Sequence, residues 1–210
     1  MAERKTAEKL DATTEEKIKE AARAVFHKKG FAATRTRDIA EEAGINLALL
    51  NYYFRSKARL FEIIMLETIA AFVQTMAMAL NDEKTTLEEK IKQVATGYID
   101  MIEKEPDLPI FMLSEIRNNP DLLLVKLPIK QVIMGSVFFR QHREAVIQGK
   151  ITEPSPLHFL MNLIGLIMFP FIASPLLKRV GDLKDEDFNR LMQERKKLIP
   201  VWIEAIMKAK

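Results

Sequence analysis

Apolar side chains recur along the chain every three or four residues, as on one face of an α-helix, and no alternation of apolar and polar residues persists. The clearest N-terminal stripe consists of Ile18, Ala22, Val25 and Phe26. Gly30 follows this stripe and predicts the end of the helix, because glycine readily adopts the left-handed backbone of a helix C-cap. The pattern as a whole predicts an all-α fold.

After this helix the stripes become short. Thr34 or Thr36 predicts the start of a second helix, which Gly44 ends. Asn46 is a good N-cap for a short third helix, and Ser56 for a longer fourth one. Two short helices joined by a tight turn predict a helix-turn-helix, although helical hairpins also occur in many proteins without a DNA partner.

Five further helices are predicted beyond the fourth, which makes about nine in all. They are expected over residues 86–104, 111–116, 122–148, 157–173 and 186–207, with a break near Pro128 inside the third of them. We expect a polar, frayed tail over residues 1–12, a three-helix helix-turn-helix domain over residues 13–61 and a helical remainder over residues 62–210.

The amino-acid composition excludes several kinds of catalytic and metal-binding site. The absence of cysteine from the 210 residues excludes disulfides, thiolate metal sites and a thiol nucleophile. The three histidines are too widely spaced for a metal-binding motif, so no metal is expected. No phosphate-binding loop, dinucleotide-binding glycine turn or nucleophile elbow occurs. We therefore expect neither an enzyme nor a cofactor. No secretion signal opens the chain, which favours a cytoplasmic protein.

The net charge of +3 is concentrated near the N-terminus. Residues 1–60 contain 13 Lys and Arg against 9 Asp and Glu, whereas the other 150 residues contain 19 against 20. A basic module on a neutral body indicates an anionic partner for the first part only, although an excess of four charges is small enough to arise by chance.

The run GFAATRTRDIAEEAGINLALLNYYFRSKARLFEIIM carries the strongest signal in the chain. It resembles the DNA-binding domain of the tetracycline-repressor (TetR/AcrR) family of bacterial transcription regulators. The matching landmarks are Gly30-Phe31, Thr34, Arg37-Asp38-Ile39-Ala40, Ala43-Gly44-Ile45, Leu50-Asn51-Tyr52-Tyr53-Phe54 and Ser56-Lys57. The similarity covers only the first quarter to third of the chain.

The resemblance implies that the third helix is the recognition helix, which enters the major groove of DNA. Residues expected to reach base edges are Leu47, Ala48 and Asn51. Residues expected to contact phosphates are Thr36, Arg37, Tyr52, Tyr53, Ser56 and Lys57. Position 47 is often lysine or another polar residue in the family, position 48 often glycine and position 53 frequently histidine, so base readout here is expected to be more apolar than usual.

Structural alternatives exist for these residues. Tyr53 fits a half-buried core position as well as a phosphate contact. Arg37 stands four residues before Glu41 and has the spacing of a solvent-exposed ion pair. Asn51 could also simply be solvated.

The family plan further implies that the remainder forms a homodimer and binds a small apolar or amphipathic ligand. Candidate pocket residues are Phe72, Met76, Tyr98, Met101, Phe111, Met112, Met134, Phe138 and His142. Candidate dimer-interface residues are Leu160, Ile164, Met168, Leu198 and Trp202. For each of these residues, a place in an ordinary hydrophobic core is the competing interpretation.

The resulting prediction is a dimeric regulator, most simply a repressor, that binds a palindromic operator in double-stranded DNA and is released by its ligand. A helical carrier of apolar ligands without operator binding is one alternative. A membrane-associated protein is another, because residues 157–177 lack charged side chains. Two prolines, His158 and Asn162 interrupt that stretch and favour a soluble interface, so no membrane is expected as a partner.

Overall fold

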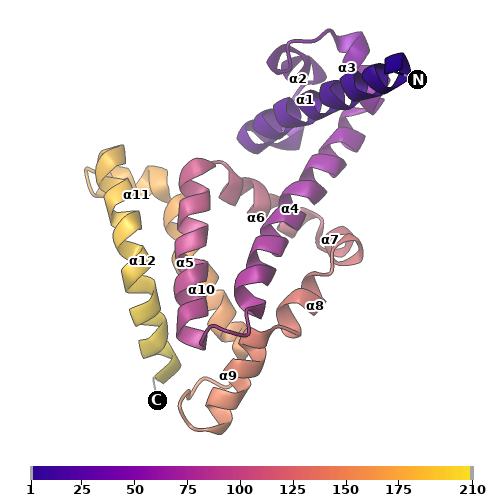
Figure 1. Cartoon of the computed structure of the whole chain (residues 1–210). Helices are drawn as coiled ribbons and strands as arrows, with labels where there is room; N and C mark the ends of the chain where they lie inside the picture. Colours follow the sequence, from indigo (N-terminus) through magenta and orange to yellow (C-terminus); the bar gives the residue numbers. More distant parts are fainter. Residues whose placement is uncertain (1, 209–210) are drawn as a thin grey trace. The chain divides into compact units, whose positions relative to one another are not determined.

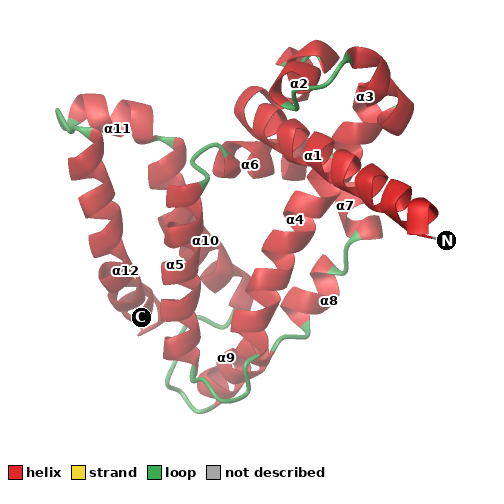
Figure 2. Cartoon of the chain, turned by 45° about the horizontal axis from the view of Figure 1, so that its top comes forward, coloured by secondary structure: helices red, strands yellow, loops and turns green. Residues whose placement is uncertain are grey.

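The computed structural model describes residues 2–208, with side chains from Thr13 onward. Within that range the chain forms helices and no strand, so the predicted all-α fold is confirmed (Figure 2). The first four helices are α1 (Ala2–Ala33), α2 (Thr36–Glu42), α3 (Leu47–Phe54) and α4 (Lys57–Asn81). The others are α5 (Leu87–Lys104), α6 (Leu108–Asn118), α7 (Pro120–Lys126), α8 (Ile129–Met134), α9 (Val137–Ile147), α10 (Pro156–Ile172), α11 (Ser174–Val180) and α12 (Asp185–Lys208).

The described residues thus form twelve helices, where the sequence predicted about nine. The expected break near Pro128 separates α7 from α8. A second break was not predicted: the Ser136 hydroxyl accepts a hydrogen bond from the Phe139 amide at 3.3 Å and caps α9. The α11 helix was not predicted either. The chain bends by 69° between α10 and α11, next to Pro175, which has no N–H to continue the preceding helix.

Packing divides the chain into two compact units. The first runs to Ala70 and includes Phe111–Pro120, and the second comprises Ala71–Ile110 and the chain from Asp121 onward. The division therefore falls within α4, not after residue 61. Phe111 belongs to the first unit because its ring packs against His27, with centroids 4.6 Å apart. The predicted frayed tail, residues 1–12, lies outside the residues whose side chains are described.

An aromatic core organises the first unit. Phe26 of α1 packs edge to face against Phe61 of α4, with ring centroids 4.9 Å apart, a favourable arrangement of aromatic rings. Phe31 packs against Phe61 at the same centroid distance. Leu50 and Phe54 of α3 are buried, as their spacing on one helix face predicts. The small helices are therefore anchored by a few large side chains.

Gly30 interrupts α1, where the sequence predicted the end of the helix with a left-handed cap. Its backbone angles, φ 70° and ψ 177°, lie in a region that residues with a Cβ atom rarely enter. Helical structure resumes to Ala33, and the buried Thr34 hydroxyl then donates a hydrogen bond to the Gly30 carbonyl at 2.7 Å. This break sets the direction in which the chain leaves α1 towards α2.

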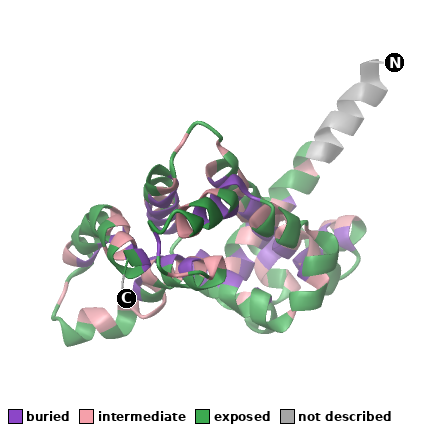
Figure 3. Ribbon diagram, turned by 90° about the horizontal axis from the view of Figure 1, so that it is seen from below, coloured by how far each residue is buried: buried purple, intermediate pink, exposed green. Residues whose placement is uncertain are grey.

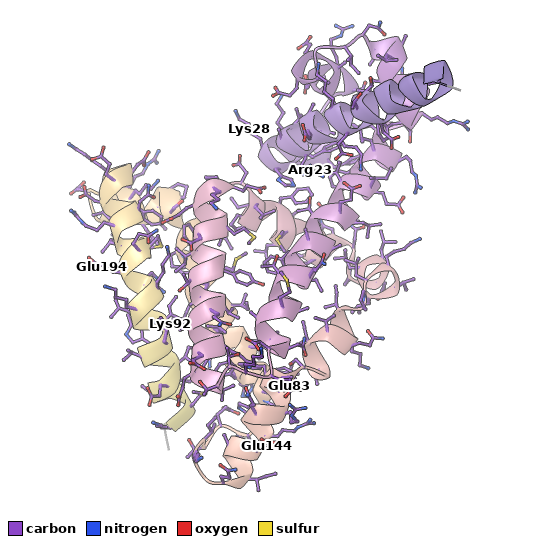
Figure 4. The ribbon with its side chains drawn as sticks, viewed as in Figure 1. Arg23, Lys28, Glu83, Lys92, Glu144 and Glu194 are labelled. Carbon is purple, nitrogen blue, oxygen red and sulfur yellow. The ribbon has the colours of Figure 1, made fainter. Side chains whose placement is uncertain are left out.

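Ion pairs also join α1 to α4. The Glu67 carboxylate of α4 binds Lys19 Nζ at 2.6 Å and Arg23 Nη2 at 3.0 Å (Arg23 is labelled in Figure 4). The hydrogen bond to Glu67 is the largest cause that raises the pKa of Lys19 above its ordinary value. Charge pairing therefore adds to the apolar packing between these two helices.

In the second unit, α5, α10 and α12 lie side by side, with α9 against α5 and α10 (Figure 1). The buried residues of these helices are mostly large and apolar; buried residues of the chain are purple in Figure 3. The fully buried ones include Ile99, Phe138, Phe159, Leu163, Ile199 and Ile203. The long apolar run of α10 is thus partly explained by this core.

A proline inside α10 is compensated by α12. Pro170 has no N–H and leaves the carbonyl of Leu166, four residues earlier, without its helical donor. Arg195 of α12 donates from Nη2 to this carbonyl at 2.7 Å. Its guanidinium also stacks on Trp202, with Cζ 4.9 Å from the ring centre. Burial lowers the pKa of Arg195, and these contacts tie α12 to α10.

A buried ammonium group holds the loop between α4 and α5. Lys90 is fully buried, and its Nζ donates hydrogen bonds to the carbonyls of Asp82 and Thr85 and to the Thr85 hydroxyl. In the same loop Glu83, labelled in Figure 4, pairs with Arg140 of α9 at 2.7 Å. Because the Lys90 charge is fully hydrogen-bonded, it stabilises the loop instead of disrupting the core.

By length and apolar composition alone, α4 could cross a membrane, and so could two bent helix pairs that include α9 and α10. Packing accounts for the apolar residues of α4. Leu60 and Ile64 are buried in the first unit, and Met76 and Leu80 in the second. The composition of α4 therefore follows from its passage through both units.

Candidate nucleic-acid interface and ligand cavity

The α3 helix is fixed at both ends and on one face. Asn46 caps its N-terminus, as predicted, because Asn46 Oδ1 accepts a hydrogen bond from the Leu49 amide at 2.8 Å. Leu50 and Phe54 anchor the buried face. The opposite face is consequently held outward by a rigid helix.

All three residues predicted to read bases lie on this outward side. Leu47 is 39% exposed, and Ala48 and Asn51 are also exposed. Tyr52 is 74% exposed, whereas Tyr53 is half-buried. The two tyrosine rings pack edge to face, with centroids 5.4 Å apart. The exposed side of α3 therefore carries one amide, two apolar side chains and one phenol.

Asp38 fixes the start of α2, where Thr36 is the first helical residue. Its carboxylate accepts a hydrogen bond from the Arg35 amide at 3.1 Å and pairs with Lys29 at 3.0 Å. The amide contact, followed by the lysine, lowers the pKa of Asp38. Thr36 is half-exposed and Arg37 exposed, so both are accessible to a partner of the first unit.

The two predicted phosphate contacts at the start of α4 differ. Ser56 is exposed and its hydroxyl accepts from the Arg59 amide at 3.1 Å, so it caps α4 as predicted. Lys57 is half-buried, and its Nζ donates to the carbonyls of Phe31 and Thr34, both at 2.8 Å. The local sequence could not predict these two hydrogen bonds, because Thr34 and Phe31 lie 23 and 26 residues from Lys57.

The geometry suits a nucleic acid better than catalysis. Arg35 and Arg55 add exposed positive charge in the segments that flank α2 and α3. An exposed helix face with an amide and a phenol can read base edges and contact phosphates. Among the residues whose side chains are described, no group of three His, Asp or Glu side chains could hold a metal ion.

Known proteins share this first unit. The sequence profile of "Bacterial regulatory proteins, tetR family" matches residues 18–64, which include α2, α3 and the start of α4. The first unit therefore contains a tetR-family segment, as the resemblance in the sequence implied. The whole chain is also 25% identical over 205 residues to YttP of Bacillus subtilis (strain 168), described as a probable HTH-type transcriptional regulator. That alignment covers 95% of this chain and 96% of YttP.

Solved structures show the same fold over nearly the whole regulator. The crystal structure of HlyIIR, a hemolysin II transcriptional regulator, has a TM-score of 0.63 at 21% identity and covers 95% of this chain and 99% of HlyIIR. A TetR-like transcriptional regulator from Rhodococcus sp. RHA1 has a TM-score of 0.56 at 18% identity, covering 88% and 94%. By its tetR-family profile and its similarity to YttP, the protein is a transcriptional regulator and not an enzyme, as predicted.

In the second unit of the regulator, four of the nine predicted pocket residues surround one cavity of about 30 Å³ between α4 and α5. They are Phe72, Met76, Tyr98 and Met101. The sequence analysis missed Thr75, Ala79, Gln93, Val94 and Gly97, which also line the cavity. Their helical spacing from the predicted residues is the signal that could have found them.

The other five predicted pocket residues lie elsewhere. Phe111 and Met112 are buried in the first unit. Met134, at the end of α8, is 43% exposed. Phe138 and His142 of α9 are buried in the second unit but do not line the cavity.

Among the described residues of the second unit, four side chains have a buried polar atom without a hydrogen-bond partner, and in two of them no polar atom has a partner. These two are Tyr98, through its hydroxyl, and His142, through both ring nitrogens. Burial raises the pKa of Tyr98 well above its ordinary value, so the phenol stays neutral and can donate a hydrogen bond. Burial lowers the pKa of His142, only partly opposed by Glu153.

The depressed pKa of His142 predicts acid sensitivity. Below the ordinary histidine value of 6.5, the unfolded chain binds a proton at this residue more readily than the folded one. We expect stability to be constant above this value and to fall as pH drops through it, by at most about 1.4 kcal/mol per pH unit. The free energy of unfolding of wild type and of His142→Leu is measured with urea between pH 8 and pH 5, a range of about three pH units that spans the usual histidine pKa. If the free energy falls equally in both proteins, His142 is not the cause of the acid sensitivity. The exposed His158, changed to Gln, is the control.

The predicted dimer residues sit beside an exposed apolar face. Leu160, Ile164, Met168 and Trp202 are half-buried against the core, and Leu198 is 40% exposed. Other large apolar residues of the two helices are also exposed: Leu157, Met161 and Phe169 on α10, and Leu191, Val201 and Ile206 on α12. Several exposed apolar residues on two helices that pack together are typical of a protein–protein interface.

Proposed function

We propose that the regulator binds a palindromic DNA operator as a homodimer, represses transcription in the cytoplasm, and is released by a small apolar or amphipathic ligand. The observation that carries the proposal is the outward face of α3, where Leu47, Ala48 and Asn51 are exposed on a helix anchored by Leu50 and Phe54.

Each exposed group of α3 matches a chemical feature of the major groove. The Asn51 amide can form two hydrogen bonds to adenine, at N6 and N7. Leu47 and Ala48 can pack on a thymine methyl group, so each half-site should contain a T-rich contact there. Thr36, Arg37, Tyr52, Tyr53 and Ser56 would position the helix through phosphates.

A dimer is proposed because one short recognition helix reads too few bases for a unique site. The exposed apolar face of α10 and α12 supplies the interface. In such a dimer the recognition helices must be separated by one DNA turn, about 34–36 Å. A ligand that changes this separation weakens binding.

The cavity between α4 and α5 is the proposed ligand site. At about 30 Å³ it is far smaller than the roughly 300–1,000 Å³ of typical ligand pockets, so a ligand must push the helices apart. Because α4 also supplies Lys57 and Phe61 to the first unit, displacement of α4 would reach the DNA-binding residues along one continuous helix.

The test is selection of random duplex DNA by purified wild type, by Asn51→Ala and by a control, Asn189→Ala, at an exposed position of α12. We expect a palindrome whose recognition relaxes by about 1–3 kcal/mol at one A·T position with Asn51→Ala only. G·C pairs opposite Leu47 and Ala48 would contradict the thymine contact. No enriched sequence would contradict operator binding and favour a ligand carrier.

A further inference from the structure

Lys57 occupies an unusual place at the start of α4. Its Nζ lies 2.8 Å from two carbonyl oxygens, those of Phe31 and Thr34, and 4.1 Å from the centre of the Phe31 ring. Both carbonyls belong to the short stretch between the break at Gly30 and the start of α2. One side chain therefore contacts three groups of a single connection.

These contacts occupy most of the ammonium group. It has three N–H donors, of which two are engaged by carbonyls, while the aromatic face covers part of its remaining surface. Carbonyls at the end of a helix have no intrahelical donor, so each needs a partner from elsewhere. Lys57 supplies that partner for two residues at once.

The contacted connection determines where the helix-turn-helix begins. The Thr34 hydroxyl bonds back to Gly30, and Arg35 caps α2 together with Asp38. Phe31 also packs on Phe61 of α4. Lys57 thus links the start of α4 to the end of α1 at the point from which α2 departs.

We propose that Lys57 is a positioning residue of the DNA-binding unit: it fixes the α1–α2 connection through the carbonyls of Phe31 and Thr34 instead of holding a DNA phosphate. The inference deepens the proposed DNA-binding function and rests on it for its effect on affinity, but the internal link exists without DNA.

The two roles predict different effects of Lys57→Met, which keeps the apolar stem and removes the donors. A positioning residue predicts that the folding equilibrium constant falls about tenfold or more, because hydrogen bonds from a charged donor are lost. It also predicts weaker binding of a random-sequence DNA duplex with an unchanged slope of log Kd against log salt. A phosphate ligand predicts unchanged stability and a slope smaller by about 0.9. Loss of slope overturns the proposal, whatever the stability.

Arg59→Met is the matched control. Arg59 lies two residues further along α4, is exposed, and forms only a 3.4 Å pair with Glu62, so its loss should leave stability unchanged. Unfolding is measured by urea denaturation of the full chain. If wild type binds no DNA at all, the proposed function fails, while the stability comparison still decides whether the link exists.

A measurement on wild type covers the case in which Lys57→Met does not fold. The ring of Phe31 should shift the ε-methylene proton resonances of Lys57 upfield, because these protons lie next to the ammonium over the aromatic face. We expect the upfield shift in free protein and in the DNA complex. Its disappearance on DNA binding would mean that the ammonium leaves the carbonyls for a phosphate, and would overturn the proposal.

Discussion

Leu47→Glu is expected to weaken DNA binding about a thousandfold while the protein remains folded. Leu47 is the first residue of α3 and is 39% exposed, so a carboxylate there would face the groove and its phosphates. Placing like charges together at an interface costs several kcal/mol, and about 4 kcal/mol corresponds to three decades in Kd. The measurement is fluorescence anisotropy with the selected operator.

The same substitution should not destabilise the regulator. A negative charge in the first turn of a helix is favourable by about 0.3–1 kcal/mol. Leu47→Gln is the matched control, because glutamine has nearly the shape of glutamate but no charge. We expect its affinity for the operator to fall less than about tenfold, the equivalent of about 1.4 kcal/mol. If Leu47→Glu binds the operator as tightly as Leu47→Gln does, the exposed face of α3 is not the DNA-binding surface.

The second large effect is expected at Arg195. We predict that Arg195→Met destabilises the second unit by about 2 kcal/mol, because the Leu166 carbonyl loses its only described donor and the stack on Trp202 is lost. The value is smaller than the sum of these contacts because methionine removes a charge whose burial is itself costly. This loss of unfolding free energy is measured by urea denaturation, with circular dichroism as the signal.

Pro170 provides the internal check. In Pro170→Ala the new amide can donate to Leu166 along α10, so the carbonyl no longer depends on Arg195. Arg195→Met should then cost about 1 kcal/mol less than in the wild-type background, a coupling that a double-mutant cycle detects. Additive effects of the two substitutions would show that Arg195 does not compensate for the proline.

Local signals accounted for much of the first unit. Short stretches of sequence predicted several features that the structure confirms. These are the caps Asn46 and Ser56, the break at Gly30 and the buried positions Leu50 and Phe54. The break before α9 was missed because Ser136 occurs within an apolar run that otherwise resembles a continuous helix. The sequence did predict the end of α10 near residue 173, but not that the chain forms the short α11 helix beyond it.

Contacts distant in sequence could not be predicted in this way. The pairing of Glu67 with Arg23 spans 44 residues, and no helical periodicity links them. Phe111 was expected in a ligand pocket but packs with His27, because an apolar side chain does not itself reveal which core it joins. The cavity was located only in part for the same reason: its lining comes from two helices whose register relative to each other is a tertiary property.

The stack of Arg195 on Trp202 has a consequence for spectroscopy. Trp202 is the single tryptophan of the chain and lies on α12, in the second unit. Its emission therefore reports on the environment of α12, and its quenching or shift would follow association through that helix. Unfolding of the DNA-binding unit should leave this emission unchanged unless the two units unfold together. Comparing tryptophan fluorescence with circular dichroism in one titration thus measures the cooperativity between the units.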